Sequence, residues 1–189
     1  MDETKGPSLI SPVRRVPLDG RGGGSGVVSL TPAKPASRLS LRARGDALDA
    51  LSSALGVALP REPKSSASAG TRHALWLGPD EWLVIDESGA DLAVSAGGAD
   101  VLHSAVDVSH RNTAIVVSGA GAEATLSAGC PQDLRLAVFP VGACSRTLMG
   151  KIEVVIWRRA ADEFRVECWR SFAGYAFDFL NEAARDAAA

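Results

Sequence analysis

The 189-residue chain has no strong excess of charge and no long hydrophobic run. Its 20 Lys and Arg against 22 Asp and Glu give a formal net charge of −2, whereas a dedicated nucleic-acid-binding domain needs a net basic surface. No apolar stretch approaches the roughly 18 residues of a membrane-spanning helix, and the chain opens with Met1-Asp2-Glu3 rather than a basic and apolar leader. We therefore expect a soluble, cytoplasmic protein that binds neither nucleic acid nor membranes.

Cysteine and histidine are also scarce. The three cysteines, Cys130, Cys144 and Cys168, are odd in number and form no Cys-x-x-Cys pair, so neither a disulfide framework nor a zinc knuckle is predicted. Cys130 could be drawn as a nucleophile with His110 as its base, but no neighbour activates the thiol, and a buried cysteine is the commoner case. The wide spacing of these residues, and of His103 from His110, prepositions no metal ligands. We predict no catalytic, cofactor-binding or metal-binding residue in this chain.

Aromatic residues are absent before Trp76, and residues 1–37 contain sixteen Gly, Pro or Ser. Such a segment has little apolar area to bury. We therefore predict a flexible arm over residues 1–37, followed by a single α+β domain over residues 38–186. Two apolar pairs in the arm, Leu9-Ile10 and Val27-Val28, could still dock on a partner.

The remainder of the chain mixes strand and helix patterns. Strands are predicted around residues 39–41, 74–77, 82–85, 105–108, 114–117, 152–157 and 164–168. Helices are predicted over residues 47–55, irregularly over 87–98, and over 120–128 and 172–185. The order shows no regular strand–helix–strand alternation. It therefore indicates an α+β fold with a mostly antiparallel sheet.

The last predicted helix has one strongly apolar face. Its members fall at helical spacing and are Phe172, Tyr175, Ala176, Phe179 and Leu180. Ser171 is placed to cap the first turn. We expect Phe172 and Tyr175, with Trp157 and Trp169, to belong to the core rather than to a stacking platform.

A glycine-containing turn over residues 118–124 follows a predicted strand and opens a predicted helix, as in dinucleotide-binding folds. That fold also needs an acidic residue about twenty positions further on. No carboxylate lies between Asp133 and Glu153, and Gly129-Cys130-Pro131 cuts the helix short. Nucleotide binding is therefore disfavoured.

Five motifs occur in order from Leu77 onward. They are Leu77-Gly78-Pro79-Asp80-Glu81-Trp82-Leu83, the segment 106–114 (Val-Asp-Val-Ser-His-Arg-Asn-Thr-Ala), Gly129-Cys130-Pro131-x-Asp133-Leu134, Phe139-Pro140-Val141-Gly142, and Trp169-Arg170-Ser171-Phe172. Through these motifs the chain resembles the gamma subunit of heterotetrameric sarcosine oxidase. Residues 1–37 contribute nothing to this resemblance.

That gamma subunit in turn looks like the folate-binding domain of the glycine-cleavage aminomethyltransferases. The segments that carry this likeness are Val117-Ser118-Gly119, Leu126, Arg146-Thr147-Leu148-Met149 and the strand 154–158. The aminomethyltransferases carry a turn whose carboxylate faces the folate, and here Gly150-Lys151-Ile152-Glu153-Val154 offers one acid at most. The chain is also about half as long as that family, so the resemblance implies a folate-binding fold without its chemistry.

The resemblance implies a non-catalytic gamma-type subunit of a four-chain flavoenzyme. Such an enzyme oxidatively demethylates sarcosine to glycine, forms hydrogen peroxide and passes the one-carbon unit to tetrahydrofolate. FAD, FMN, NAD and zinc are then expected in the other subunits, and none in this chain. The expected partners are the alpha, beta and delta subunits, chiefly the large alpha subunit. A free-standing folate-binding protein of the aminomethyltransferase-like superfamily remains the alternative.

The polar run Ser109-His110-Arg111-Asn112 lies between two predicted strands, where Gly, Asn and Asp alone would suffice for a turn. Arginine offers five donors in a rigid fork and is enriched at interface hot spots. We predict that Arg111 contacts a partner subunit, together with His110, Asn112 and Arg170. The alternative is that Arg111 pairs with Asp107 or with carbonyls of its own chain.

Overall fold

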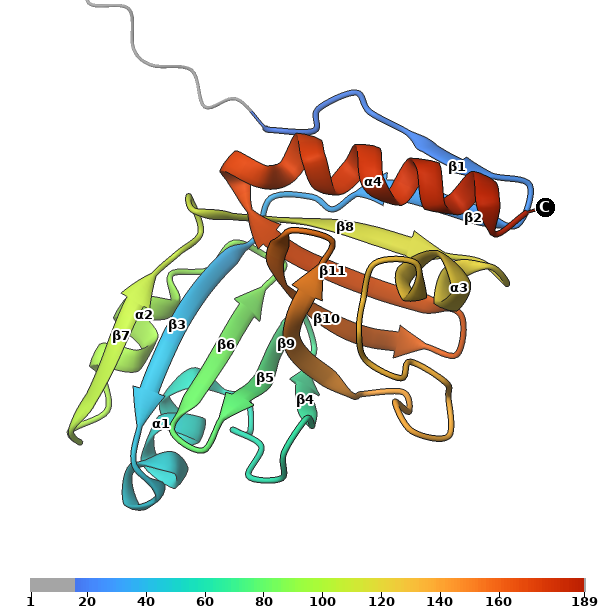
Figure 1. Ribbon diagram of the computed structural model, residues 1–189. Helices are drawn as coiled ribbons and strands as arrows, with labels where there is room; N and C mark the ends of the chain where they lie inside the picture. The colour runs from blue at the N-terminus through green and yellow to red at the C-terminus, as the bar shows by residue number, and fades with distance from the viewer. Residues whose placement is uncertain (1–15, 189) are drawn as a thin grey trace, which may run out of the picture.

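The structure, a computed structural model, describes residues 16–188 and contains two antiparallel β-sheets with helices on their outer faces (Figure 1). The six-stranded sheet has the order β1-β2-β8-β11-β10-β9 and contains β1 (Gly23–Ser25), β2 (Val28–Pro32), β8 (Asn112–Ser118), β9 (Cys144–Met149), β10 (Ile152–Ala160) and β11 (Glu163–Trp169). The five-stranded sheet has the order β4-β5-β6-β3-β7 and contains β3 (Ser37–Ala43), β4 (Ser66–Ala69), β5 (Arg72–Gly78), β6 (Glu81–Asp86) and β7 (His103–Asp107). The helices are α1 (Leu48–Leu55), α2 (Leu92–Gly97), α3 (Ala122–Ser127) and α4 (Ala173–Asp186), with 3-10 turns at Gly45–Ala47 and Arg170–Phe172. The α+β class and the antiparallel pairing predicted from the sequence are confirmed.

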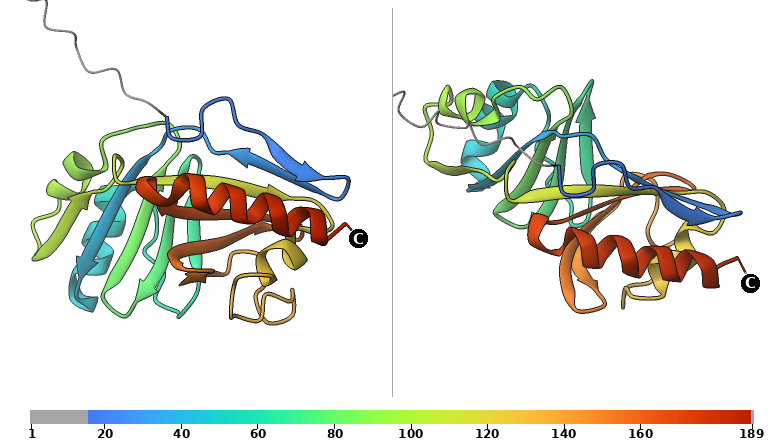
Figure 2. Two further views of the ribbon diagram at one scale, coloured as in Figure 1. Left: turned by 45° about the horizontal axis from the view of Figure 1, so that its top comes forward. Right: turned by 90° about the horizontal axis from the view of Figure 1, so that it is seen from above.

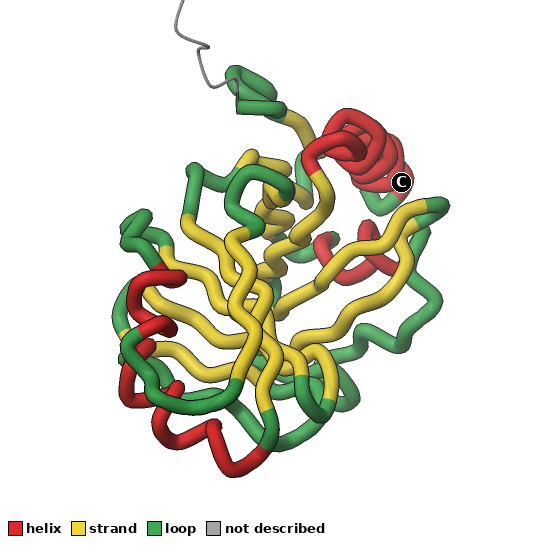
Figure 3. Tube along the Cα trace, turned by 90° about the vertical axis from the view of Figure 1, so that its left-hand side faces the viewer, coloured by secondary structure: helices red, strands yellow, loops and turns green. Residues whose placement is uncertain are grey.

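The elements form four layers, with α1 and α2 outside the five-stranded sheet and α3 and α4 outside the six-stranded sheet (Figures 1 and 2). Strand alternation builds the three apolar layers between them. In β6, Trp82 and Val84 pack toward α1 and α2, whereas Leu83 faces the other sheet. In β10, Val154 packs toward α4 and Val155 toward the five-stranded sheet. In Figure 3, α4, the helix beside the C-terminal mark, lies on the opposite side of the strands from the helices at the lower left.

The hairpin of β5 and β6 forms where the turn chemistry predicts it. Proline at position 79 presets the backbone angle that a tight turn needs, and Glu81 pairs with Gly78 across the turn. The helix predicted over residues 47–55 is also present, with Leu48, Leu51 and Leu55 buried. None of the helices between residues 16 and 188 is long and apolar enough to cross a bilayer.

Residues 16–37 differ from the expectation of a flexible arm over residues 1–37. Strand β2 pairs with β8, and the side chains of Leu18, Val28 and Leu30 are buried under α4 and β8. This segment is rich in Gly and Pro, and its apolar side chains are buried only because they contact β8 and α4, which come much later in the sequence. Local composition does not reveal such contacts. Residues 1–15, with Leu9-Ile10, lie outside the described residues.

Helix α4 buries a different face from the one predicted. Its buried residues are Ala173, Ala176, Phe177, Leu180, Ala183 and Ala184. The helix approaches β1 so closely that a Cβ on Gly23 would lie 2.5 Å from Asn181 Oδ1 and 3.2 Å from the ring of Phe177. The predicted cap is also wrong, because α4 begins after Phe172 without a side-chain cap and Ser171 lies in the preceding 3-10 turn.

Candidate subunit interface

The turn that carries His110, Arg111 and Asn112 connects β7 to β8 and is held from inside. Buried Val108 accepts hydrogen bonds at its carbonyl oxygen from the backbone N–H groups of Arg111 and Asn112, each at 3.0 Å. The hydroxyl of Ser109 accepts a hydrogen bond from the backbone N–H of Arg38 at 2.8 Å. The turn is therefore anchored to β3 and presents Arg111 outward.

The structure brings the four predicted contact residues to one place. Asn112 at the start of β8 pairs with Trp169 at the end of β11, and the backbone N–H of Arg170 donates to the carbonyl of Arg111 at 2.7 Å. His110 is exposed beside them on the same turn. Segments distant in the sequence thus meet at one end of the central strands of the six-stranded sheet, where β8 begins and β11 ends.

An arginine–aromatic surface, which we define as Arg111, Trp169 and Phe172, lies at these strand ends. The guanidinium carbon of Arg111 lies 5.1 Å from the centre of the Trp169 ring, and Trp169 stacks on Phe172 with centroids 5.9 Å apart. Trp169 is 41% exposed and Phe172 is 40% exposed. Arg111 also donates weakly to the side chain of Asn112 at 3.4 Å. The stack prearranges three side-chain types that dominate interface energetics.

The expectation that these aromatic residues form core is wrong for three of the four side chains. Trp157 is buried, but Trp169, Phe172 and Tyr175 are exposed. For Tyr175 the reason is the orientation of α4, which directs Phe177 at the sheet instead, whereas Trp169 ends β11 and Phe172 lies in the following 3-10 turn. The hydroxyl of Tyr175 instead accepts a hydrogen bond from the backbone N–H of Lys151 at 3.2 Å, in the turn between β9 and β10.

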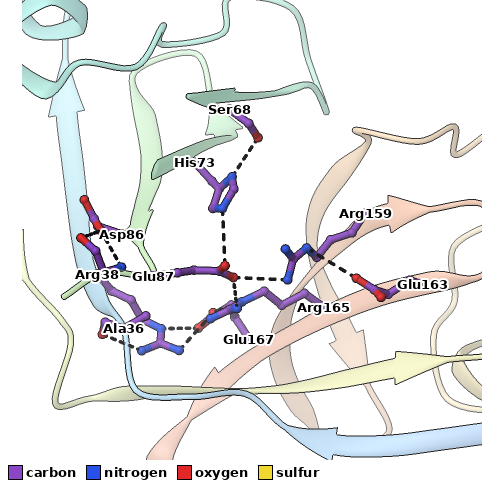
Figure 4. Close-up of polar contacts among 11 residues, drawn as sticks. Ala36, Arg38, Ser68, His73, Asp86, Glu87, Arg159, Glu163, Arg165 and Glu167 are labelled. Atoms are coloured by element: carbon purple, nitrogen blue, oxygen red, sulfur yellow. Dashed lines mark hydrogen bonds and ion pairs between the residues drawn. The ribbon is translucent and has the colours of Figure 1, made fainter. Parts of the chain in front are cut away.

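A second polar arrangement, which the sequence reasoning missed, lies between the two sheets. We define the inter-sheet ion cluster as Arg38, Glu87, Arg159, Arg165 and Glu167 (Figure 4). Arg38 of β3 donates to Glu167 of β11 at 2.6 Å, and Arg165 donates to Glu167 at 2.8 Å. Glu87 accepts from Arg165 at 2.8 Å and from Arg159 at 3.2 Å. The cluster therefore links the five-stranded sheet to the six-stranded sheet.

The interior position of this cluster decides its role. The side chains of Arg38, Arg165 and Glu167 are only 3%, 3% and 1% exposed. Charges in such a position need their partners, because an unpaired buried charge is strongly destabilising. One signal was available in the sequence, since Arg165 and Glu167 alternate with apolar residues and so share a face of β11.

His73 of β5 borders the ion cluster. Its Nε2 lies 4.0 Å from Glu87 Oε2, its Nδ1 lies 2.8 Å from the hydroxyl of Ser68, and its ring centre lies 4.8 Å from that of Trp157. Burial lowers the pKa of His73 below its ordinary value of 6.5, although the carboxylate of Glu87 opposes the shift. The imidazole is therefore held in its neutral form at neutral pH.

A second ion pair links the sheets at the end near β9. Arg146 donates to Glu81, and Arg42 donates to the same carboxylate at 2.9 Å. The hydrogen bond from Arg146 lowers the pKa of Glu81 below its ordinary value. Glu153, the one acid of the segment compared with the folate turn, lies in β10 with its carboxylate 3.9 Å from Arg146. These charges are paired within the chain.

All three cysteines lie in the interior of the chain. Cys130, Cys144 and Cys168 are all buried, and burial raises the pKa of Cys144 and of Cys168 to about 12. Those two thiols therefore stay protonated at neutral pH, and the thiolate is the reactive form. Within residues 16–188 no group of three or more His, Cys, Asp or Glu side chains is arranged to hold a metal ion.

The glycine-containing turn before α3 serves packing. Gly119 has a φ of +113°, and a Cβ there would lie 2.4 Å from the carbonyl oxygen of Val27. A Cβ on Gly121 would lie 2.7 Å from a methyl of Val28. The glycines therefore admit the close approach of the chain around β2, and the similarity to a phosphate-binding turn has this structural origin.

Comparison with known proteins identifies the family. A model of the sarcosine oxidase gamma subunit family matches residues 43–186. The chain is 30% identical over 182 residues to the sarcosine oxidase subunit gamma of Corynebacterium sp. strain P-1, covering 90% of each protein. It is 36% identical over 121 residues to the corresponding subunit of Arthrobacter sp., covering 62% of this chain and 59% of that one.

Solved structures agree with the sequence comparison. A chain of the heterotetrameric sarcosine oxidase from Corynebacterium sp. U-96, solved in complex with pyrrole 2-carboxylate, superposes with a TM-score of 0.82 at 28% identity, covering 88% of this chain and 89% of that one. The glycine cleavage system aminomethyltransferase T from Bartonella henselae shares the fold, with a TM-score of 0.58 at 14% identity, and 49% of its length is covered. The chain belongs to the sarcosine oxidase gamma subunit family.

Proposed function

We propose that this chain is the non-catalytic gamma-type subunit of a cytoplasmic heterotetrameric sarcosine oxidase. In this proposal the complex oxidatively demethylates sarcosine to glycine, produces hydrogen peroxide and transfers the one-carbon unit to tetrahydrofolate. FAD, FMN, NAD and zinc belong to the other subunits. The gamma-type chain binds the alpha, beta and delta subunits, with the large alpha subunit as its main contact.

The observation that carries this proposal is the extent of the structural likeness. The similarity to a chain of a heterotetrameric sarcosine oxidase covers nearly nine tenths of both chains. A likeness of that extent supports a shared place in the assembly rather than a shared fold alone. The paired charges and protonated thiols of this chain are consistent with a structural role.

The arginine–aromatic surface is the part of the chain that we propose for the contact with the large subunit. Arginine and tryptophan are enriched among residues whose truncation weakens complexes most. Arg111 is held over Trp169 before any partner binds, so little side-chain entropy is lost on association. His110, Asn112 and Arg170 lie next to this stack and extend the proposed contact.

Co-purification tests the proposed function. The chain is expressed with an affinity tag, together with the alpha, beta and delta chains of its own host, and the eluate is analysed for subunits, flavin absorbance and sarcosine oxidation. We expect all four chains to elute together with flavin and activity, and the tagged chain alone to elute without either. Stoichiometric flavin in the isolated chain, or its failure to elute with the large subunit, would contradict the proposal.

The aminomethyltransferase-like fold makes folate the informative control ligand. Tetrahydrofolate is titrated into the isolated chain by calorimetry and, separately, into the complex. Tight binding by the isolated chain, in the absence of any co-purifying subunit, would favour the alternative of a free-standing folate-binding protein.

A further inference from the structure

The segment between α3 and β9 presents a run of apolar side chains to solvent. Five of the six residues in the range 136–141 are apolar and exposed, and they are Leu136, Ala137, Val138, Pro140 and Val141. The three largest of them, Leu136, Val138 and Val141, are 47%, 55% and 54% exposed. Single exposed apolar residues are ordinary on protein surfaces, whereas a contiguous apolar patch is typical of a contact site. We call residues 136–141 the apolar turn.

The apolar turn is held in one conformation by the rest of the chain. The backbone N–H groups of Val138 and Phe139 both donate to the carbonyl oxygen of Arg135 at 2.8 Å. The ring of Phe139 is 1% exposed and belongs to the core between the six-stranded sheet and its helices. The buried side chain of Arg158 donates to the carbonyl oxygen of Leu134, just before the turn. Such a turn loses little conformational entropy on binding, so its exposed side chains are preorganised for a contact.

The residues around the apolar turn do not favour a membrane as its partner. Segments that bind membrane surfaces combine several Lys or Arg residues with exposed aromatic rings. The range 130–143 contains one basic residue, Arg135, and its guanidinium already donates to both carboxylate oxygens of Asp133. The one aromatic ring of that range belongs to Phe139 and is buried. An uncharged protein surface is therefore the better occupant.

The area that stable association needs selects the partner. A stable interface buries about 800 Å² on each side and involves about 20–30 residues of each protein. Two copies of the chain joined through the six residues of the apolar turn would fall far short of this. The arginine–aromatic surface, even with His110, Asn112 and Arg170 beside it, is equally small. A partner that contacts both surfaces comes closer to the required area than a partner that contacts one of them.

The two surfaces lie at opposite ends of β11. Trp169 ends this strand, and Arg158, which holds the apolar turn, also donates to the carbonyl oxygen of Ala161 just before the strand begins. In Figure 1 the loop between α3 and β9 lies at the lower right, whereas the turn between β7 and β8 lies at the upper left. The strand is about 20 Å long at roughly 3.4 Å per residue. A patch of about 800 Å² is about 30 Å across, so one interface can include both surfaces.

We propose that the apolar turn is a second contact with the large partner subunit, which receives the side chain of Val138 in an uncharged, apolar hollow. The arginine–aromatic surface provides the polar and stacking contacts of this interface, and the apolar turn provides burial without charge. This inference rests on the proposed function, because it adds a second contact to the partner named there.

Photocrosslinking identifies the occupant in the intact complex. Val138 is replaced by the photoreactive residue p-benzoylphenylalanine in a chain co-expressed with the alpha, beta and delta subunits, and the irradiated complex is analysed by mass spectrometry. The same residue in place of Val94, a 73% exposed valine of α2, is the control. We expect a link from position 138 to the large subunit and none from position 94. A link from position 138 to a second copy of this chain or to another subunit, or no link, would overturn the proposal.

A matched pair of charge insertions measures the contribution of the turn to affinity. Val138→Asp should weaken binding of the large subunit about tenfold or more, because a carboxylate in an apolar hollow loses its hydration without gaining a partner. Val94→Asp makes the same change outside the five-stranded sheet and should bind within about twofold of the unmodified chain. Both valines are exposed, so both variants should melt within about two degrees of the unmodified chain. Equal affinity of the two variants would refute the second contact.

Vesicle flotation tests the alternative occupant. The isolated chain is mixed with vesicles of anionic phospholipid, and we expect it to stay unbound. Flotation that Val138→Asp abolishes would assign the apolar turn to a lipid surface and overturn the proposal. If the unmodified chain fails to bind the large subunit at all, the proposed function fails, and this inference fails with it. If the unmodified chain and Val138→Asp bind equally well, the second contact alone is refuted.

Discussion

Arginine has two different roles in this chain, and the inter-sheet ion cluster and the arginine–aromatic surface show them side by side. In the cluster, Arg38 and Arg165 are almost fully buried and share the carboxylate of Glu167. On the surface, Arg111 is exposed and lies over the ring of Trp169. The two sites are joined by β11, which carries Glu167 and Trp169 two residues apart.

The two sites differ in the groups that each arginine can bind. A buried guanidinium must be neutralised inside the chain, because its desolvation penalty is several kcal/mol. A guanidinium stacked on an exposed indole keeps its fork accessible to a second protein. The cluster should therefore govern the stability of the isolated chain, and the surface should govern assembly.

The strongest test of this comparison removes the shared carboxylate of the cluster. Glu167→Gln leaves the buried Arg38 without a charge partner and Arg165 with Glu87 alone, so the free energy of unfolding should fall by about 3–5 kcal/mol. Urea unfolding of the isolated chain measures this loss.

An exposed ion pair on α4 supplies the matched control. Glu182 pairs with Arg185, and both side chains are largely exposed, so Glu182→Gln should change the free energy of unfolding by less than about 1 kcal/mol. Similar unfolding curves for Glu167→Gln and Glu182→Gln would mean that the buried cluster does not hold the two sheets together.

The second test compares two phenylalanines near the start of α4. Phe177 is 2% exposed, and its ring lies under the guanidinium of Arg21 at 4.3 Å, so Phe177→Ala should cost about 3 kcal/mol of folding free energy. Phe172→Ala removes a ring that is 40% exposed and should cost less than about 1 kcal/mol. Thermal unfolding of both variants checks the orientation of the helix. The reverse ranking would support the face predicted from the sequence.

The third test addresses Arg111. Arg111→Ala should leave the melting temperature of the isolated chain within about one degree, because the side chain is exposed. It should weaken binding of the large subunit by about 2 kcal/mol, roughly 30-fold. Surface plasmon resonance against the large subunit measures the affinity. A variant that melts several degrees lower but binds normally would assign Arg111 to the intramolecular role instead.

The sequence predicted the parts of the fold that local patterns determine. The alternation of Leu39 and Leu41 and the proline turn at position 79 gave β3 and the β5–β6 hairpin correctly. Strand β2 was not predicted, because its two buried residues, Val28 and Leu30, lie among Gly, Pro and Ser. Its partner β8 is also far from it in the sequence. Pairing at long range therefore decides whether such a segment is ordered.

The site was predictable in its polar part only. The run from His110 to Asn112 stood out because arginine is not needed in a plain turn, and the structure places Arg170 beside it. The aromatic part was missed because two helix faces of α4 overlap at Ala176 and Leu180, and the bulkier one looks like the core. In the fold, Phe177 and Asn181 of α4 meet β1 at Gly23 and Gly24, and this long-range contact has no signature in hydrophobic spacing.

The smallest expected effect concerns the pH dependence of the ion cluster through His73. Burial lowers the pKa of His73, so the unfolded chain binds a proton below about pH 6.5, while the folded chain still resists it. Unfolding is then favoured as the pH falls, and the stability lost amounts to no more than about 1.4 kcal/mol per pH unit. The lowered pKa values of Glu81 and Asp86 act only at more acidic pH, near the ordinary carboxylate range.

Urea unfolding between about pH 7.5 and 5.5 separates the effect of His73 from that of the carboxylates. His73→Asn, which retains a polar group near Ser68, should unfold more easily at the upper end of this range, and its deficit relative to the unmodified chain should shrink toward the lower end. A deficit that grows on acidification would mean that the attraction of Glu87, 4.0 Å away, outweighs burial and that the cluster accepts the protonated imidazole.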